Sequence, residues 1–308
     1  MRLGCKVVGL NEKPDLVVVF NHKRSQGEVG SLKFKSGDMA LVVFEPEVVA
    51  PVNHAKWIRS KYCRVYVPSP MWKKNVEDRV FDWPQTEAQK FQGNKQSFNR
   101  QDRFVMILGN HVSVGRLELY SLRRDVATIK DLPLDLFGPN WLDSSLRNIL
   151  RGLKSLWRFG LVRDFKIKLP RKLFMRDKLS NYFGETENKF ETYSRYKFSL
   201  VIENSSNYLS EKLIDAVISG TIPIYVGPNL DTFGLPQDMA YCVVGDSRAI
   251  QEAMGKLMES KDLQKVILDS GREFLQSSRY LEMVNKQALR NLANMIVTDL
   301  LCREESGE

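Results

Sequence analysis

The chain of 308 residues is poor in cysteine and has no long hydrophobic run. Its four cysteines are far apart and include no C-x-x-C pair, which argues against a disulfide-stapled scaffold and the common zinc motifs. No apolar stretch approaches the roughly 18 residues of a membrane-spanning helix. The first residues also lack an apolar core of signal-peptide length. We therefore expect reduced thiols and a cytoplasmic location.

Motifs for several nucleotide, metal and nucleic-acid functions are missing as well. No G-x-x-x-x-G-K-S/T segment is present, which excludes a P-loop hydrolase. No D-x-D pair is available to hold a divalent cation. Without an arginine-rich run or zinc-finger spacing, nucleic-acid recognition has no motif behind it.

What the sequence does contain is an excess of basic residues. Lys and Arg number 46 against 37 Asp and Glu, a formal net charge of +9. This balance favours an anionic partner, which can be a nucleotide, a nucleic acid or an acidic membrane face. The hydrophobic share of 43% is ordinary for a globular protein, and the length allows one large or two medium domains.

Residues 1–100 are predicted to form a first α/β domain. A helix is expected near residues 52–59, and the polar stretch from 81 to 103, rich in Gln and Asn, is the predicted domain connection. Three short apolar runs are typical of buried strands and lie at residues 15–20, 39–44 and 63–67.

Residues 101–308 are predicted to form a second α/β domain with a helical tail. The region from 140 to 182 is basic and permits no clear assignment. The expected elements are a strand at 103–110, a helix at 116–124, a strand ending at 134–138, and mostly helix from 248 to 301.

The segment from Tyr196 to Gly227 predicts a strand, a turn, a helix and a second strand. Residues 197–202 and 221–226 read as buried strands, and Gly220 stands where it would end the helix between them. The apolar spacing of that helix starts at Leu209. Such β-α-β units build parallel sheets that bind ligands at the carboxyl ends of the strands.

This segment resembles the signature of the α-1,3/4-fucosyltransferase family. The family core reads roughly Y-K-F-x-L-x-F-E-N-S, a Tyr, T/S-E-K, and then G-x-x-P-I/V-x-x-G. The matching positions here are Tyr196-Lys197-Phe198, Glu203-Asn204-Ser205, Tyr208, Ser210-Glu211-Lys212, Gly220, Pro223 and Gly227. Many fixed positions at the right spacing make the resemblance specific.

The resemblance implies the GT-B architecture, in which two Rossmann-like domains face each other across a cleft. It also implies an inverting transfer of L-fucose from GDP-β-L-fucose to a glycan hydroxyl, without a metal or other cofactor. Animal members carry an N-terminal membrane anchor and lumenal disulfides. This sequence shows neither, so it looks more like the bacterial type or a trimmed chain.

The resemblance assigns the donor site to the signature and to one earlier arginine. Lys212 and Arg116 are the expected cations for the diphosphate, with Arg195 as the alternative to Arg116. Glu211 is expected to accept hydrogen bonds from the ribose hydroxyls. The remaining polar residues expected at the guanosine or phosphate site are Glu203, Asn204 and Tyr208.

The catalytic base is expected on the loop after the strand at 39–44. Glu45-Pro46-Glu47 resembles the family segment that supplies the carboxylate, so Glu45 is the predicted base and Glu47 the alternative. His54 follows closely and could touch the acceptor glycan, although a lone loop histidine is more often solvated.

Two other functions fit the sequence less well. A GT-B transferase that uses another sugar nucleotide would differ only in donor binding. A basic nucleic-acid-binding protein would be retained on DNA or RNA with steep salt dependence and would not bind GDP. The expected partners are GDP-fucose and an oligosaccharide acceptor, with peripheral contact to an anionic membrane face and no specific nucleic acid.

Overall fold

The computed structural model describes residues 14–22, 38–88, 99–111, 113, 117–141 and 179–306. The chain divides into two compact units, one formed by Met1–Pro84 with Glu282–Glu308 and the other by Gln85–Leu281. This division differs from the predicted domains 1–100 and 101–308 in two respects. The chain enters the second unit after Pro84, within the predicted connection, and its C-terminal segment returns to the first unit.

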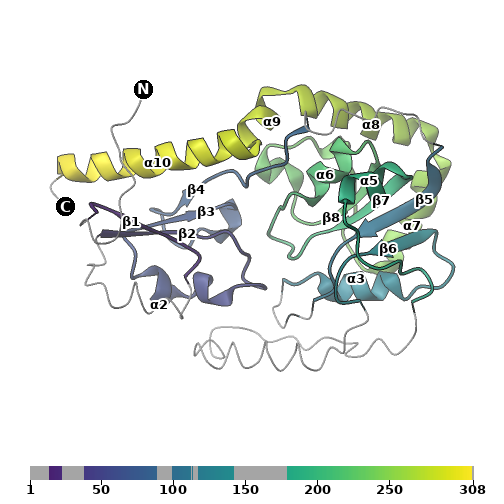
Figure 1. The fold of residues 1–308 in the computed structure, drawn as a ribbon, viewed down its shortest axis with the longest axis horizontal. Coiled ribbons are helices and arrows are strands. Elements are labelled where there is room, and N and C mark those ends of the chain that lie inside the picture. Colours follow the sequence, from purple (N-terminus) through teal and green to yellow (C-terminus); the bar gives the residue numbers. More distant parts are fainter. Residues whose placement is uncertain are drawn as a thin grey trace. The chain divides into compact units, whose positions relative to one another are not determined.

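The first unit contains a parallel sheet with the order β1-β2-β3-β4 (Figure 1). Its strands are β1 (Val17–Phe20), β2 (Met39–Val42), β3 (Arg64–Val67) and β4 (Arg79–Val80). The three predicted strands of this unit are confirmed. The helix predicted near 52–59 is instead a 3-10 helix, η3 (Pro51–His54), followed by a single α-helical turn, α2 (Lys56–Arg59).

The second unit contains a parallel sheet with the order β6-β5-β7-β8-β9. The strands are β5 (Gln101–Ile107), β6 (Leu134–Phe137), β7 (Tyr196–Ile202), β8 (Ile222–Val226) and β9 (Tyr241–Cys242). The chain runs from β5 outward to β6 and then crosses to β7 on the other side of β5, so the strand order reverses between β5 and β7. Ligands of open parallel sheets bind beside such a switch point, at the carboxyl ends of the strands.

Helices cover both faces of this second sheet (Figure 1). Side chains of α3 and α7 join one face of the sheet in a continuous apolar core, and α5 and α6 cover the other face. The helices of this unit are α3 (Tyr120–Ala127), α5 (Lys189–Ser194), α6 (Lys212–Ile218), α7 (Ser247–Glu259) and α8 (Lys261–Gln276), while α9 (Ser278–Met283) spans the border of the two units.

Two helix starts differ from the sequence prediction. The helix expected at 116–124 begins at Tyr120, and the helix expected from Leu209 begins at Lys212. In both cases the preceding residues hydrogen-bond elsewhere and so do not join the helix. The predicted helix end is confirmed, since Gly220 follows the last turn of α6 with a φ of +69°, a conformation that glycine adopts without strain.

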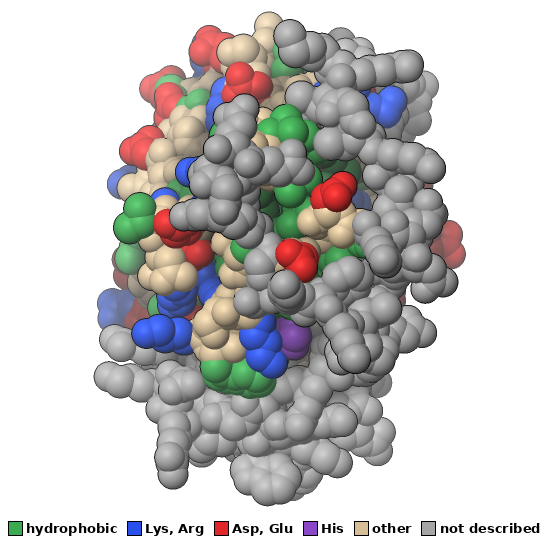
Figure 2. All heavy atoms as spheres, turned by 90° about the vertical axis from the view of Figure 1, so that its left-hand side faces the viewer, with side chains coloured by type: hydrophobic (Ala, Val, Ile, Leu, Met, Phe, Trp, Pro, Cys, Tyr) green, Lys and Arg blue, Asp and Glu red, His purple; other side chains and the backbone are tan. Residues whose placement is uncertain are grey.

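The surface is mixed in character on the face shown in Figure 2. Basic, acidic and apolar side chains all occur there among the described residues. This face is therefore not a uniformly basic surface of the kind that tracks a nucleic-acid backbone. Among the described residues, no helix combines the length and the apolar character needed to cross a membrane.

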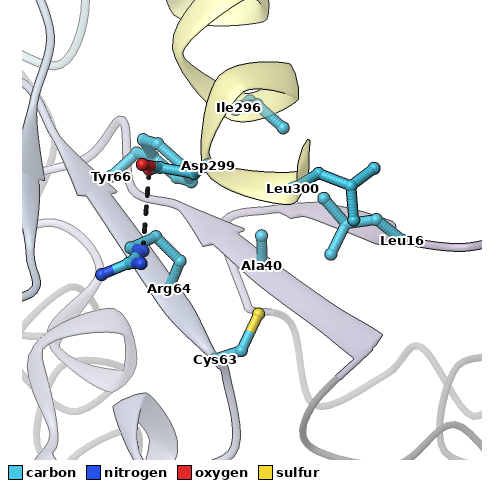
Figure 3. Close-up of a pocket in the computed structure, with 8 residues that line it drawn as sticks. All are labelled: Leu16, Ala40, Cys63, Arg64, Tyr66, Ile296, Asp299 and Leu300. Atoms are coloured by element: carbon cyan, nitrogen blue, oxygen red, sulfur yellow. Dashed lines mark hydrogen bonds and ion pairs between the residues drawn. The ribbon is translucent and has the colours of Figure 1, made fainter. Parts of the chain in front are cut away.

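The last helix, α10 (Asn285–Ser306), belongs to the first unit. Leu292 and Ile296 pack against Ala40, Val42 and Tyr66 of the sheet. The side chain of Asp299 accepts hydrogen bonds from the Tyr66 hydroxyl at 2.9 Å and from Arg79 Nη2 at 3.1 Å. Arg64 Nε lies 3.6 Å from the same carboxylate (Figure 3).

We predict that Asp299→Asn weakens the attachment of α10. The amide cannot pair with Arg64 and Arg79, so the free energy of unfolding should fall by about 1–3 kcal/mol. Urea denaturation measures this loss. Asp269→Asn is the matched control, because Asp269 pairs with the exposed Lys265 and Arg272 within α8. A similar loss in both variants would contradict the anchoring role of Asp299.

Candidate functional site

A buried arginine joins the carboxyl ends of β5 and β7. The Arg123 side chain of α3 is 1% exposed, and its Nε and Nη2 donate to the carbonyl of Ile202 at 3.1 and 2.6 Å. Its Nη1 donates to the Gly109 carbonyl at 3.0 Å, and Nη2 also donates to Asn204 Oδ1 at 2.8 Å. The two strands that flank the switch point are therefore held together where they end.

The environment of Arg123 combines burial with an aromatic ring. Its guanidinium carbon lies 4.7 Å from the centre of the Tyr120 ring, which attracts a cation. Burial lowers the pKa of Arg123 to about 10, against partial compensation by Tyr120, Glu203 and Glu118. Arg123 thus remains a cation at neutral pH and gives this edge of the sheet a fixed positive charge.

The next residue, Arg124, organises the loop after β5. Its Nη1 donates to Asn110 Oδ1 at 3.2 Å and to the His111 carbonyl at 2.7 Å. Its Nη2 donates to Ser121 Oγ at 3.0 Å within α3. Neighbouring residues of a helix point in different directions. Arg123 therefore bonds to the ends of β5 and β7, while Arg124 bonds to the loop that follows β5.

The loop after β7 docks against the residues that lead into α3. Glu118 and Ser205 form an isolated antiparallel bridge. The Leu119 amide donates to the Asn204 carbonyl at 3.2 Å, and the Ser206 amide donates to the Leu117 carbonyl at 3.0 Å. This docking explains why α3 starts at Tyr120. Arg116, one of the two predicted phosphate cations, lies outside the described residues.

Glu203, Ser210 and Lys212 form a compact polar cluster beside this loop. Glu203 is fully buried, and its carboxylate accepts from the Ser210 amide at 2.9 Å and from Ser210 Oγ at 2.7 Å. Lys212 Nζ donates to Ser210 Oγ at 2.8 Å and lies 3.5 Å from Glu203 Oε2. The Lys212 side chain is 17% exposed. It is therefore held by the buried carboxylate without being fully enclosed.

Gly227 allows the end of β8 to approach this cluster. A Cβ atom at Gly227 would lie 2.9 Å from Glu203 Cγ and would overlap the Tyr225 hydroxyl. The Glu203 amide also donates to the Val226 carbonyl at 2.9 Å. Glycine at 227 is therefore required by the close packing of β8 against Glu203.

The structure brings the predicted signature residues together. Tyr208 and Glu211 differ from the prediction in their position, and Glu203 differs in its contacts. Tyr208 and Glu211 precede α6 and are not in its first turns. Tyr208 is buried, whereas Glu211 is half-buried. Glu203 was expected to line the ligand site, yet its carboxylate is enclosed and supports Ser210 and Lys212 from below.

The alternative cation Arg195 is misplaced for this site. It directly precedes β7, at the amino end of the strand, and its carbonyl accepts from the amide of Gln101 at the start of β5. Its guanidinium group pairs with Glu191 at 2.5 Å on an exposed face. Since the cluster around Lys212 lies at the opposite end of β7, Arg195 is not part of it.

The predicted base loop follows β2 in the first unit. Glu45 and Glu47 are both half-buried, and a turn at Pro46 lies between them. Burial raises the pKa of Glu47, although Lys74 and Arg59 counteract this rise. His54 is buried and not solvated: its Nε2 donates to the Glu45 carbonyl at 2.9 Å.

Sequence reasoning missed Arg123 and Arg124. The available signal was the adjacent pair of arginines at the end of the helix predicted at 116–124. Nothing in the spacing indicated that the acceptors would be the Ile202 and Gly109 carbonyls, which come from strand ends far along the chain.

Comparison with known proteins gives two relevant sequence matches. The chain is 31% identical to α-(1,3)-fucosyltransferase B of Drosophila melanogaster over 169 residues, which cover 53% of this chain and 31% of the relative. It is 33% identical to a fucosyltransferase-like protein of Arabidopsis thaliana over 86 residues, which cover 25% of this chain and 17% of the relative. Over these segments the chain is similar in sequence to fucosyltransferases. No family model matches.

The fucosyltransferase matches leave much of the relatives unaccounted for, because this chain spans less than a third of the length of either relative. A crystal structure of an α1,3-fucosyltransferase resembles the fold with a TM-score of 0.51 at 16% identity, covering 94% of this chain and 80% of that one. A glycosyltransferase from Rickettsia africae gives a TM-score of 0.50 at 10% identity over 92% and 76%. The fold is that of the GT-B glycosyltransferases, as predicted.

Replacing Arg123 tests the organisation of this edge. Arg123→Met would remove every hydrogen bond to the Ile202 and Gly109 carbonyls, so the free energy of unfolding should fall by on the order of 3 kcal/mol. Chemical denaturation is the measurement. Arg248→Met on α7 is the control, because the Arg248 side chain is 85% exposed and should leave stability unchanged. An Arg123 variant as stable as the control would refute the bridging role.

Proposed function

We propose that this fucosyltransferase relative is an inverting enzyme that transfers L-fucose from GDP-β-L-fucose to a hydroxyl of a GlcNAc- or glucose-containing glycan, with an α-1,3 or α-1,4 linkage. The observation that carries the proposal is the Glu203–Ser210–Lys212 cluster. It stands at the carboxyl end of β7, beside the switch point, in a chain related to fucosyltransferases.

Lys212 is the proposed phosphate ligand of the donor. An ammonium group has three N–H donors, and the contacts to Ser210 and Glu203 engage two of them. The third can meet a diphosphate oxygen. Because the Glu203 carboxylate holds Lys212 in place before the donor binds, little reorganisation is needed as negative charge grows on the departing GDP.

The other donor contacts follow the family resemblance. Arg116 is the proposed second cation, so that two basic side chains neutralise the diphosphate without a metal ion. Glu211, half-buried and next to Lys212, is the proposed partner of the ribose hydroxyls. The Asn204 side-chain oxygen already accepts from Arg123, which supports a role for Asn204 in shaping the guanosine or phosphate site.

The proposed reaction is a single displacement at the anomeric carbon. The acceptor oxygen attacks C1 of fucose as the bond from C1 to the diphosphate oxygen breaks, and GDP leaves with that electron pair. The acceptor proton passes to a carboxylate, which we assign to Glu45 with Glu47 as the alternative. The transition state resembles an oxocarbenium ion, which a nearby carboxylate also stabilises.

Donor identity is tested by ligand-dependent stability. GDP or GDP-fucose should raise the melting temperature, because a ligand that binds only the folded state stabilises it by mass action. UDP and CMP should not. A thermal-shift series with the three nucleotides makes this measurement. Equal shifts for UDP and GDP would favour a different sugar nucleotide, and retention on DNA without any GDP effect would favour the nucleic-acid alternative.

The role of Lys212 is tested by Lys212→Ala. Loss of a charge-assisted hydrogen bond should weaken GDP binding by about 2–3 kcal/mol, roughly 30- to 160-fold in Kd. Calorimetric titration with GDP measures the change. Lys265→Ala on the exposed face of α8 is the control. Transfer should also survive EDTA, and strict dependence on Mn²⁺ or Mg²⁺ would contradict charge neutralisation by side chains.

Catalysis is separated from binding by Glu45→Gln. The amide keeps the size of the side chain but cannot accept the proton, so transfer should slow by roughly 10²–10⁴-fold. GDP affinity should stay near that of the wild type, and the acid limb of the pH–rate profile should disappear. Glu47→Gln is the matched control. An inactive Glu47→Gln beside an active Glu45→Gln would move the base to Glu47.

A further inference from the structure

The backbone of the proposed base is held by a buried histidine. His54 is 6% exposed, and its Nε2 donates to the Glu45 carbonyl at 2.9 Å. Its ring packs edge-on against Trp72 with the ring centres 4.8 Å apart. This packing leaves the imidazole little freedom, so its hydrogen bond acts from a fixed position.

The protonation state of His54 is defined by its surroundings. A carbonyl oxygen can only accept, so Nε2 must carry the proton. Burial lowers the pKa of His54 to about 3 and outweighs the opposing effect of the Glu45 hydrogen bond, while Arg59 and Lys74 lower it further by smaller amounts. His54 is therefore neutral at ordinary pH, and the contact with Glu45 does not vary with pH.

The backbone of the residue before Glu45 is held as well. The Phe44 amide donates to Asn21 Oδ1 at 2.9 Å, and Asn53 Nδ2 donates to the same oxygen at 3.1 Å. Asn53 is fully buried and precedes His54 in η3. The short helix η3 therefore holds the Glu45 carbonyl through His54 and supports, through Asn53, the Asn21 side chain that holds the Phe44 amide.

A third constraint comes from the sequence. Proline at 46 restricts the preceding residue to extended conformations, and the turn after it is closed by hydrogen bonds from the Val49 and Ala50 amides to the Pro46 carbonyl, both at 2.9 Å. With the Glu45 carbonyl, the Phe44 amide and the turn at Pro46 all held, the direction in which the Glu45 side chain leaves the backbone is restricted.

We propose that His54 is a positioning residue for Glu45: it fixes the peptide plane that follows the base and thereby the direction of the carboxylate. This inference rests on the proposed function. It replaces the expectation that His54 touches the acceptor, because the imidazole is buried and its Nε2 is engaged with the Glu45 carbonyl. A positioning role predicts effects on the chemical step and none on donor binding.

Three substitutions at His54 test the inference. The Gln side chain places an N–H close to the position of the imidazole Nε2, whereas Asn is too short and Ala has no donor. We expect His54→Ala and His54→Asn to lower kcat by roughly 10- to 100-fold, since small misplacements of reacting groups have effects of this size. His54→Gln should restore most of the rate. The Kd for GDP should be unchanged in all three.

A double-mutant cycle distinguishes positioning from a general structural effect. If His54 acts only through Glu45, His54→Asn should have no further effect on kcat in a Glu45→Gln background. His22→Gln is the control, because the His22 side chain is hydrogen-bonded to Tyr62, whereas the His54 side chain is hydrogen-bonded to Glu45. It should transfer fucose at the wild-type rate. Should His54→Ala fail to fold, the comparison of kcat between His54→Gln and His54→Asn still tests the positioning role.

The outcomes separate this inference from the function on which it rests. If the wild type transfers fucose and Glu45→Gln is impaired, equal rates for the Gln and Asn variants overturn the positioning role alone. If His54→Asn lowers kcat by the same factor in the wild type and in the Glu45→Gln variant, the positioning role alone is also overturned. A wild type that transfers no fucose from GDP-fucose overturns both the proposed function and the positioning role. A fully active Glu45→Gln variant shows that Glu45 is not the base, so His54 has no catalytic group to position.

Discussion

The organisation of the second unit depends on the contact of Arg123 with the carbonyls of Ile202 and Gly109. The carboxyl ends of parallel strands leave main-chain groups without ladder partners, and a buried carbonyl left without a donor is costly. Arg123 supplies donors to both strand ends from one planar group. It therefore determines which loops meet at the switch point, and with Arg124 it shapes the loop that follows β5.

The polar cluster of Glu203, Ser210 and Lys212 is organised by the carboxylate of Glu203. A carboxylate that is fully buried needs hydrogen bonds and an opposite charge, and Ser210 and Lys212 provide them. The ammonium group of Lys212 is consequently placed at the edge of the sheet before any ligand binds. Preorganisation of this kind is what a site for a developing diphosphate charge requires, which is why we place the donor there.

Much of this arrangement was predictable from the sequence, and the missed parts share a cause. Local patterns identified β7, β8 and the end of α6 at Gly220, because buried parallel strands are continuous apolar runs and glycine tolerates a positive φ. The late start of α6 and the enclosure of Glu203 were missed, since both follow from how the Ser210 amide and hydroxyl bond to a carboxylate seven residues earlier.

Tertiary contacts also explain why the division into units was misjudged. The attachment of α10 to the first sheet depends on Asp299 meeting Tyr66 and Arg79, more than 200 residues earlier in the chain. The local spacing of apolar residues carries no information about a contact between residues so far apart in the chain. The same holds for His54, whose spacing in the sequence suggested a solvated loop residue but whose imidazole lies buried against Trp72.

The central claim is that the nucleotide binds at the carboxyl edge of the second sheet, over the Glu203–Ser210–Lys212 cluster. Hydrogen–deuterium exchange with and without saturating GDP tests it most directly. The account predicts slower exchange in peptides that cover residues 203–212 and 109–111, and unchanged exchange in residues 45–54. Protection confined to the first unit, or none in 203–212 at a concentration of GDP that stabilises the protein, would contradict it.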